Sequence, residues 1–279
     1  MSESENVRAD FEQMIARPEA LFDLAHAALL VAAENDHHVD VQGELERLEH
    51  WAEQLRARLA PDANNLQKLA RLRAFVFEEL GFAGDHKDYF SPSNSLLHHV
   101  IERRRGIPLT LGIIMMELGW RIGMPLEGVG FPGHFLVRLA GEPGDLLLDP
   151  YRHAMSVHEE DCRHMLREIT RGEVEYSPEL LESVNKRQMI VRLLHNLKAA
   201  YVRLGNDVGA LTAVERLQLL EPDDLTQVRD RGLLLARLQR FAPAVESLRR
   251  YLAEAPGAGD REAVEATLAA ARQQLDSLN

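Results

Sequence analysis

The stretch GFPGHFLVRL, residues 130–139, places one histidine between a turn and a strand-like run. Gly and Pro punctuate its first half, and the alternating apolar residues after His134 are typical of a half-buried strand. A second apolar run, DLLLDPYR at 145–152, follows the turn sequence GEPGD and contains Asp149. The two runs predict a hairpin of short antiparallel strands, with His134 on one strand and Asp149 on the next.

Two helical runs precede this hairpin. The first extends from Leu96 to Arg104, and the second starts at Pro108 with apolar residues at helical spacing as far as Ile122. Proline suits the first turn of a helix because a backbone N–H at that position would have no partner within the helix, so its absence costs nothing. A helix packed on a small antiparallel sheet predicts an α+β core.

Residues 8–83 predict helices that precede this core. One apolar stripe has the three- and four-residue steps of a helix face, and it consists of Val41, Leu45, Leu48, Trp51 and Leu55. The charged residues between such stripes are interpreted as solvated faces.

The C-terminal part repeats itself. Ala210 and Ala244 lie 34 residues apart, as do Pro222 and Pro256. This period, with a small residue where two helices touch and a proline after the second helix, is the tetratricopeptide pattern. The last segment, from Gly259 onward, predicts a capping helix. Helical repeats of this kind indicate a protein or peptide partner.

The expected organisation is therefore an α+β domain over residues 1–186, with its core at about 90–155, followed by an all-α repeat domain over residues 187–279. The chain has 279 residues and a net charge of -12. This charge argues against nucleic acid or an anionic membrane as a partner, because phosphate binding requires a basic face.

The single cysteine, Cys162, excludes an intrachain disulfide framework and fits a reducing compartment. The N-terminal residues lack a signal-peptide core, and no run approaches the length of a membrane span. The sequence therefore predicts a cytoplasmic protein. No Gly-rich phosphate loop, serine elbow or two-carboxylate cluster is present, so no cofactor and no metal are expected.

The predicted proximity of His134 and Asp149 has two interpretations. A carboxylate that accepts a hydrogen bond from an imidazole fixes its tautomer and stabilises its charged form, as in a catalytic triad. A strand-end aspartate can also satisfy a histidine that serves only folding. Spacing alone leaves both open.

Residues 93–139, with GIP and GFPGHF, and LLLDPY at 146–151 together resemble the SirB-type branch of the transglutaminase-like superfamily. This bacterial group carries C-terminal tetratricopeptide repeats. The resemblance implies a papain-like fold with a nucleophilic cysteine at the start of the central helix, followed by histidine and then aspartate. His134 and Asp149 match the second and third members in order and context.

The cysteine itself is missing from this position. The sequence there is GIPLTLG, residues 106–112, and Thr110 is the nearest candidate nucleophile. A threonine hydroxyl ionises far less readily than a thiol, and near a helix start it commonly caps the helix. Cys162 lies after both His134 and Asp149 and does not fit the family order.

Other candidate binding residues surround this region. Arg104 and Arg105 end a predicted helix, where they complement its dipole, and with Arg138 they could instead form a subsite for an anionic ligand. His98 and His99 are neighbours on a helix, so their side chains are expected to point about 100° apart and not to share a metal. One of them could approach His134.

Two functions remain open. The first is a non-catalytic or regulatory protein whose degenerate domain keeps the cleft while the repeats bind a partner. The second is a hydrolase or acyltransferase with Thr110 as nucleophile, His134 as base and Asp149 as orienting group. The missing cysteine and the repeats favour the first.

Overall fold

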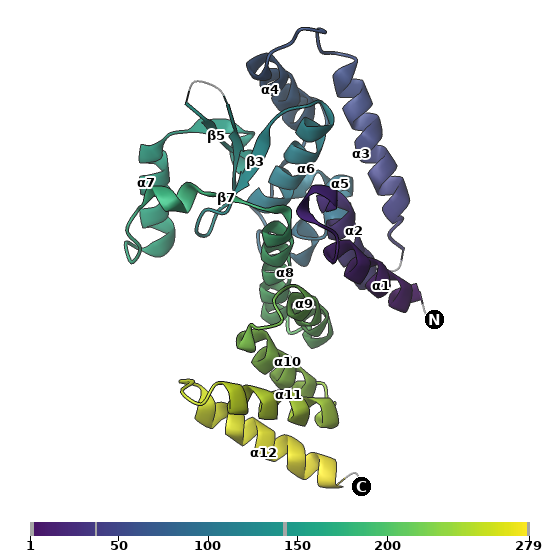
Figure 1. The fold of residues 1–279 in the computed structure, drawn as a ribbon, viewed down its shortest axis with the longest axis vertical. Helices are drawn as coiled ribbons and strands as arrows, with labels where there is room; N and C mark the ends of the chain where they lie inside the picture. The colour runs from purple at the N-terminus through teal and green to yellow at the C-terminus, as the bar shows by residue number, and fades with distance from the viewer. Residues whose placement is uncertain (1–2, 37, 142–143, 278–279) are drawn as a thin grey trace. The chain divides into compact units, whose positions relative to one another are not determined.

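The computed structural model describes residues 3–36, 38–141 and 144–277 and divides the chain into two units. The first unit is Met1–Leu193 and the second is Leu194–Asn279 (Figure 1). The first combines helices with a small antiparallel sheet, and the second is entirely helical over its described residues. The predicted fold class, an α+β part followed by helical repeats, is confirmed.

A five-stranded antiparallel sheet forms the centre of the first unit, with the strand order β6-β5-β4-β3-β7. Its strands are β3 (Leu126–Val129), β4 (Leu136–Leu139), β5 (Leu146–Asp149), β6 (Met155–Val157) and β7 (Ser183–Val184). The predicted hairpin is confirmed as the pair β4–β5, in which Val137 lies opposite Leu148. Residues 142 and 143 of the turn GEPGD lie outside the described residues.

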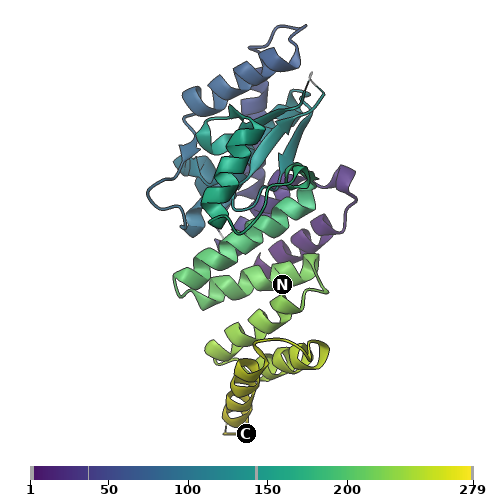
Figure 2. The same cartoon turned by 90° about the vertical axis from the view of Figure 1, so that its left-hand side faces the viewer.

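The helix α6 (Pro108–Arg121) covers one face of this sheet and is buried from Pro108 to Gly119. A Cβ atom built on Gly112 would lie 2.7 Å from the ring of Phe135, so helix and sheet approach closely at this glycine. The helix α7 (Glu159–Thr170) covers the opposite face (Figures 1 and 2). The two faces follow strand alternation, because Phe135 packs toward α6 and Leu136 packs with Leu166 of α7.

The N-terminal region is helical, as predicted. Asp40 caps α3 by accepting a hydrogen bond from the N–H of Gly43 at 2.9 Å. Leu48, Trp51 and Leu55 of the predicted stripe are buried. The elements before the sheet are α1 (Glu3–Ile15), η1 (Glu19–Leu21), α2 (Leu24–Asn35), α3 (Val41–Arg56), α4 (Asn65–Arg73), η2 (Ala74–Glu79), β1 (Ala83–Gly84), η3 (Pro92–Asn94), α5 (Leu97–Arg103) and β2 (Arg105–Gly106).

Two short 3-10 helices, η4 (Pro150–Arg152) and η5 (Pro178–Leu181), lie in the later part of the first unit. The helix α8 (Lys186–Arg203) contains the division between the units. None of the described helices is long and apolar enough to cross a membrane.

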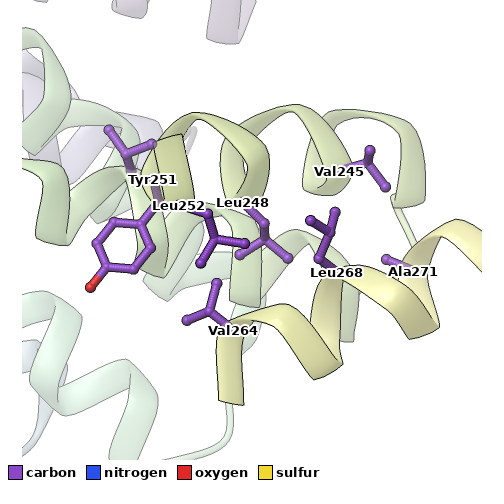
Figure 3. Close-up of a cluster of buried hydrophobic side chains, with 8 residues drawn as sticks. Val245, Leu248, Tyr251, Leu252, Val264, Leu268 and Ala271 are labelled. Atoms are coloured by element: carbon purple, nitrogen blue, oxygen red, sulfur yellow. The ribbon is translucent and has the colours of Figure 1, made fainter. Parts of the chain in front are cut away.

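Antiparallel helix packing forms the second unit. Small residues permit close approach, because a Cβ atom on Gly232 would lie 2.5 Å from Leu248, and Ala244 is fully buried. Figure 3 shows Leu248 and Leu252 of α11 packed against Val264 of α12. The helices after α8 are α9 (Asp207–Leu220), α10 (Leu225–Arg237), α11 (Phe241–Glu254) and α12 (Arg261–Ser277). The predicted repeats and the last helix are thus present.

Candidate functional site

His134 and Asp149 are in contact. The Nε2 atom of His134 lies 3.0 Å from Oδ1 of Asp149, within hydrogen-bond distance. The prediction that His134 lies on a strand is wrong, because β4 begins at Leu136 and His134 ends the preceding turn. The His134 N–H donates to the carbonyl of Phe131 at 3.0 Å, and Gly133 supplies the positive φ of +65° that this turn requires.

Arg192 of α8 donates hydrogen bonds to the turn that contains His134. Its Nη2 atom donates to the carbonyl of Phe131 at 2.9 Å and also to the carbonyl of His134. Both ends of the turn are therefore bonded to one guanidinium group. This contact fixes the backbone from which the imidazole projects.

Asp149 is only 1% exposed, and its carboxylate contacts both the His134 ring and the backbone of Tyr151. Its Oδ1 atom also accepts from the N–H of Tyr151 at 2.9 Å, which caps the 3-10 helix η4. Its Oδ2 atom has no hydrogen-bond partner among the described residues, and Nε of Arg152 lies 3.8 Å from it. The carboxylate thus serves the local fold and orients His134 at the same time.

Aromatic side chains that the sequence analysis did not identify surround this pair. The ring of Tyr151 meets His134 edge to face at 6.3 Å, and His86 and Tyr89 pack on Tyr151 at 4.6 and 6.0 Å. The Tyr151 hydroxyl donates to the carbonyl of Asp85 at 2.9 Å. Burial raises the pKa of Tyr151 to about 12, so its hydroxyl stays neutral. The sequence held one signal for Tyr151, namely its place directly after Asp149 and Pro150 in the motif.

Thr110 lies in the first turn of α6 and is fully buried, with 0% exposure. Its Oγ1 atom donates to the carbonyl of Asn94 at 2.8 Å and accepts from the N–H of Ile107 at 3.1 Å. The hydroxyl therefore joins the start of α6 to the 3-10 helix η3, and it satisfies one of the N–H groups that a helix start leaves without a partner.

Cys162 lies in the core of the first unit. It is fully buried on α7 in a cluster with Val129, Phe131 and Leu166. Burial, with smaller contributions from nearby carboxylates, raises the pKa of its thiol to about 11. A neutral, buried thiol is neither a nucleophile nor readily alkylated.

The three candidate arginines contact different protein groups. Arg104 lies over the rings of Trp51 at 4.4 Å and Phe82 at 4.8 Å. Arg105 donates to the carbonyl of Arg104 at 2.8 Å and to that of Gly81 at 3.1 Å.

Arg138 lies on β4 and donates to Ser183 of β7 at 3.0 Å. It also donates to the carbonyl of Leu181, and Glu127 and Asp145 lie within 4.0 Å of its guanidinium group. Its partners differ from those of Arg104 and Arg105.

The prediction that His98 and His99 point apart is wrong. Their ring centroids lie 3.9 Å apart with an interplanar angle of 37°. The Nε2 atom of His98 lies 3.8 Å from Oδ2 of Asp36, which follows α2. Burial, with a smaller contribution from the neighbouring His99, lowers the pKa of His98 to about 4.

The second unit has two adjoining hollows. One, of about 360 Å³, is lined by Lys198, Val202 and Leu233, and the other, of about 420 Å³, by Phe241 and Ala270. Leu233 and Arg237 of α10 line both, so this helix separates them.

The charged groups at these hollows are already paired within the unit. Lys198 forms an ion pair with Asp230 and donates to Gln227 at 2.8 Å. Arg237 pairs with Asp207 at 2.8 Å. The apolar side chains therefore provide the surface that a partner could bury.

Comparisons with known proteins agree with this division. Residues 43–195 match the model of the transglutaminase-like superfamily, and residues 197–269 match the tetratricopeptide repeat. No solved structure gives a significant match.

Curated relatives are similar to this chain over most of their length. The chain is 34% identical to a UPF0162 protein of Xylella fastidiosa over 82% of this chain and 83% of the relative. It is 31% identical to one of Pseudomonas aeruginosa, over 77% of each chain. It is 29% identical to UPF0162 protein YchA of Escherichia coli K12, over 78% of this chain and 80% of the relative. The chain therefore belongs to the SirB-type (UPF0162) family of the transglutaminase-like superfamily, with C-terminal tetratricopeptide repeats.

Proposed function

We propose that this protein is a non-catalytic, regulatory protein-binding protein in which a degenerate transglutaminase-like domain accompanies a repeat surface that binds a peptide segment of a partner. The observation that carries the proposal is the state of Thr110. Its hydroxyl is fully buried, and its bonds go to the backbone of Asn94 and Ile107. A nucleophile needs access to substrate and a base within hydrogen-bond reach.

The chemistry of threonine supports the same conclusion. Its alkoxide is hard to form, so a base would have to remove its proton as it attacks. The Nε2 atom of His134 lies at hydrogen-bond distance from Asp149, as the base of a triad requires, so the missing part is the nucleophile. In a working triad, the orienting carboxylate binds one ring nitrogen and the nucleophile the other. In this protein the Thr110 hydroxyl is hydrogen-bonded to the backbone, and Cys162 is a buried thiol with a raised pKa.

The hollows beside α10 provide the binding surface of the proposal. Val202 is 50% exposed at the first hollow, and Ala270 is exposed at the second. The proposed occupant is a protein segment that places apolar side chains in both hollows. The ion pairs Lys198–Asp230 and Arg237–Asp207 border this surface, and a partner that leaves them intact avoids burying an unpaired charge.

The test uses the full chain as bait in extracts of a bacterium that encodes it, with wild type, Val202→Arg, Ala270→Arg and Val208→Arg compared by quantitative mass spectrometry. Val208 is 63% exposed and lines neither hollow, so it is the matched control for Val202. The expected result is one or more proteins bound by wild type and Val208→Arg and lost from the other two variants. An identical set of proteins for all four baits contradicts the proposal.

The hydrolase or acyltransferase remains a second candidate, because His134 and Asp149 keep the contact of a catalytic pair at 3.0 Å. Its test is turnover of ester and glutamine-containing peptide substrates by wild type, Thr110→Ala and His134→Asn. Turnover that disappears in both variants, while their circular dichroism stays unchanged, would establish the enzyme. Equal signals from all three proteins exclude these residues as a catalytic unit.

A further inference from the structure

Three potential metal ligands meet between two helices of the first unit. Asp36 is the residue directly after α2, and His98 and His99 lie in the first turn of α5. The helices α2 and α5 pack against each other, which brings these residues together from distant parts of the sequence.

The ligand atoms are close enough to share one ion. One oxygen of Asp36 and one nitrogen from each histidine all lie within 4.8 Å of one another. The His98 Nε2 and Asp36 Oδ2 atoms are 3.8 Å apart, which is too long for a hydrogen bond but suits two ligands of one metal ion. The two tilted rings, with centroids 3.9 Å apart, place the second imidazole beside the first.

The two imidazoles also have buried nitrogens without partners. Over the described residues, Nδ1 and Nε2 of His98 and Nδ1 of His99 are buried and make no hydrogen bond. Buried polar atoms in native proteins are normally satisfied, so an unpaired group of this kind requires an explanation. A metal ion bound by one nitrogen of each imidazole explains part of this deficit, and it also explains why a carboxylate faces the two rings.

We propose that Asp36, His98 and His99 bind one first-row divalent transition-metal ion. Two imidazoles and one carboxylate favour ions such as Zn²⁺ over Mg²⁺ and Ca²⁺, which prefer all-oxygen ligands. Three protein ligands leave at least one position for water. The ion lies at the C-terminal end of α2, where the helix dipole favours positive charge.

Binding at this place joins α2 to α5. Asn94, whose carbonyl accepts the Thr110 hydrogen bond, lies three residues before the start of α5. The ion therefore stabilises the packing from which α6 begins. An ion that binds the folded state alone raises its melting temperature. The inference does not depend on whether the protein is catalytic or on what the repeats bind.

The experiment titrates the chelator-treated full chain with Zn²⁺ in competition with a chromogenic chelator and repeats the titration for Asp36→Asn, His98→Gln and His99→Gln. Asp36→Asn is the safest variant for folding, because its side chain is 38% exposed and the amide oxygen still accepts from His38. The matched control is His164→Gln, since His164 lies 3.6 Å from Glu168 on an exposed helix surface.

The expected result is one-to-one Zn²⁺ binding by wild type and His164→Gln. Each of the three ligand variants should lose more affinity than the roughly 10–100-fold that loss of a group bonded to a ligand costs. Zn²⁺ then raises the melting temperature of wild type but not that of Asp36→Asn. Absence of saturable binding overturns the proposal, and so does wild-type affinity in Asp36→Asn or in the histidine variants that fold. If a histidine variant fails to fold, Asp36→Asn decides.

Discussion

The hydroxyl of Thr110, the candidate nearest to the helix start where the family resemblance places a nucleophile, donates a hydrogen bond to the backbone carbonyl of Asn94 at 2.8 Å. The same oxygen accepts from the N–H of Ile107 at 3.1 Å. Both bonds are buried, so this side chain holds the start of α6 against η3. The predictions below follow from this arrangement and from the packing around it.

Replacing Thr110 by valine should lower the free energy of unfolding. The change keeps the shape of the side chain but leaves the Asn94 carbonyl and the Ile107 N–H without a partner, which costs about 1–3 kcal/mol. Urea unfolding followed by circular dichroism measures this change. Thr110→Ser keeps the hydroxyl and should be more stable than Thr110→Val. Equal stability of the two variants would show that the hydrogen bonds contribute nothing.

His134 and Asp149 should be energetically coupled. A double-mutant cycle with His134→Ala and Asp149→Asn is expected to give a coupling energy of about 0.5–3 kcal/mol in urea unfolding, as for other residues in direct contact. Arg152→Ala is the control, because this side chain lies 3.8 Å from Asp149 but is 70% exposed and should couple weakly. A coupling between His134 and Asp149 no larger than that of Arg152 contradicts the contact.

Cys162 should make the protein less stable at high pH. Burial raises the pKa of this thiol from 9.0 to about 11 in the folded state. The unfolded chain therefore releases the proton first, so the contribution is constant below pH 9 and is lost as the pH rises toward 11. The loss is at most about 1.4 kcal/mol per pH unit.

Urea unfolding of wild type and Cys162→Ala at pH 7 and at pH 10 measures this effect. Wild type should lose more stability than the variant between the two conditions, since both share every other titrating group. An equal loss in the two proteins means that the thiol is not buried in the folded state.

Gly112→Ala should destabilise the fold, although alanine favours helices. The added Cβ would lie 2.7 Å from the buried ring of Phe135, and overpacking of this kind costs about 1–3 kcal/mol. Combining it with Phe135→Leu tests the cause, because the smaller side chain removes the contact. The effect of Gly112→Ala on the melting temperature should then shrink, and an unchanged effect would place its origin elsewhere.

Sequence patterns predicted the order of the elements well because local rules determine them. Pro108 starts α6, and the apolar residues of β4 and β5 predicted the hairpin. The 34-residue spacing of Ala210 and Ala244 predicted the helix pairs of the second unit. In each case the pattern is a short run of residues, two neighbouring runs, or a fixed spacing along the chain.

The details of the site depended on contacts between distant segments. His134 was expected on a strand, but it belongs to the turn that Arg192 holds. Arg192 lies 58 residues later in the sequence, so a pattern read around His134 does not include it. Likewise, helical spacing predicted that His98 and His99 point apart. Packing of α5 on α2 instead brings their rings together beside Asp36.

The most direct test of the account is the reactivity of Thr110→Cys toward iodoacetamide, measured in a Cys162→Ala background with and without His134→Asn. The buried position predicts slow alkylation at neutral pH, unchanged by loss of the histidine, with rapid alkylation of the same protein in denaturant as the control. Rapid alkylation of the folded protein that collapses when His134 is replaced would contradict the account. It would show that His134 still activates this position.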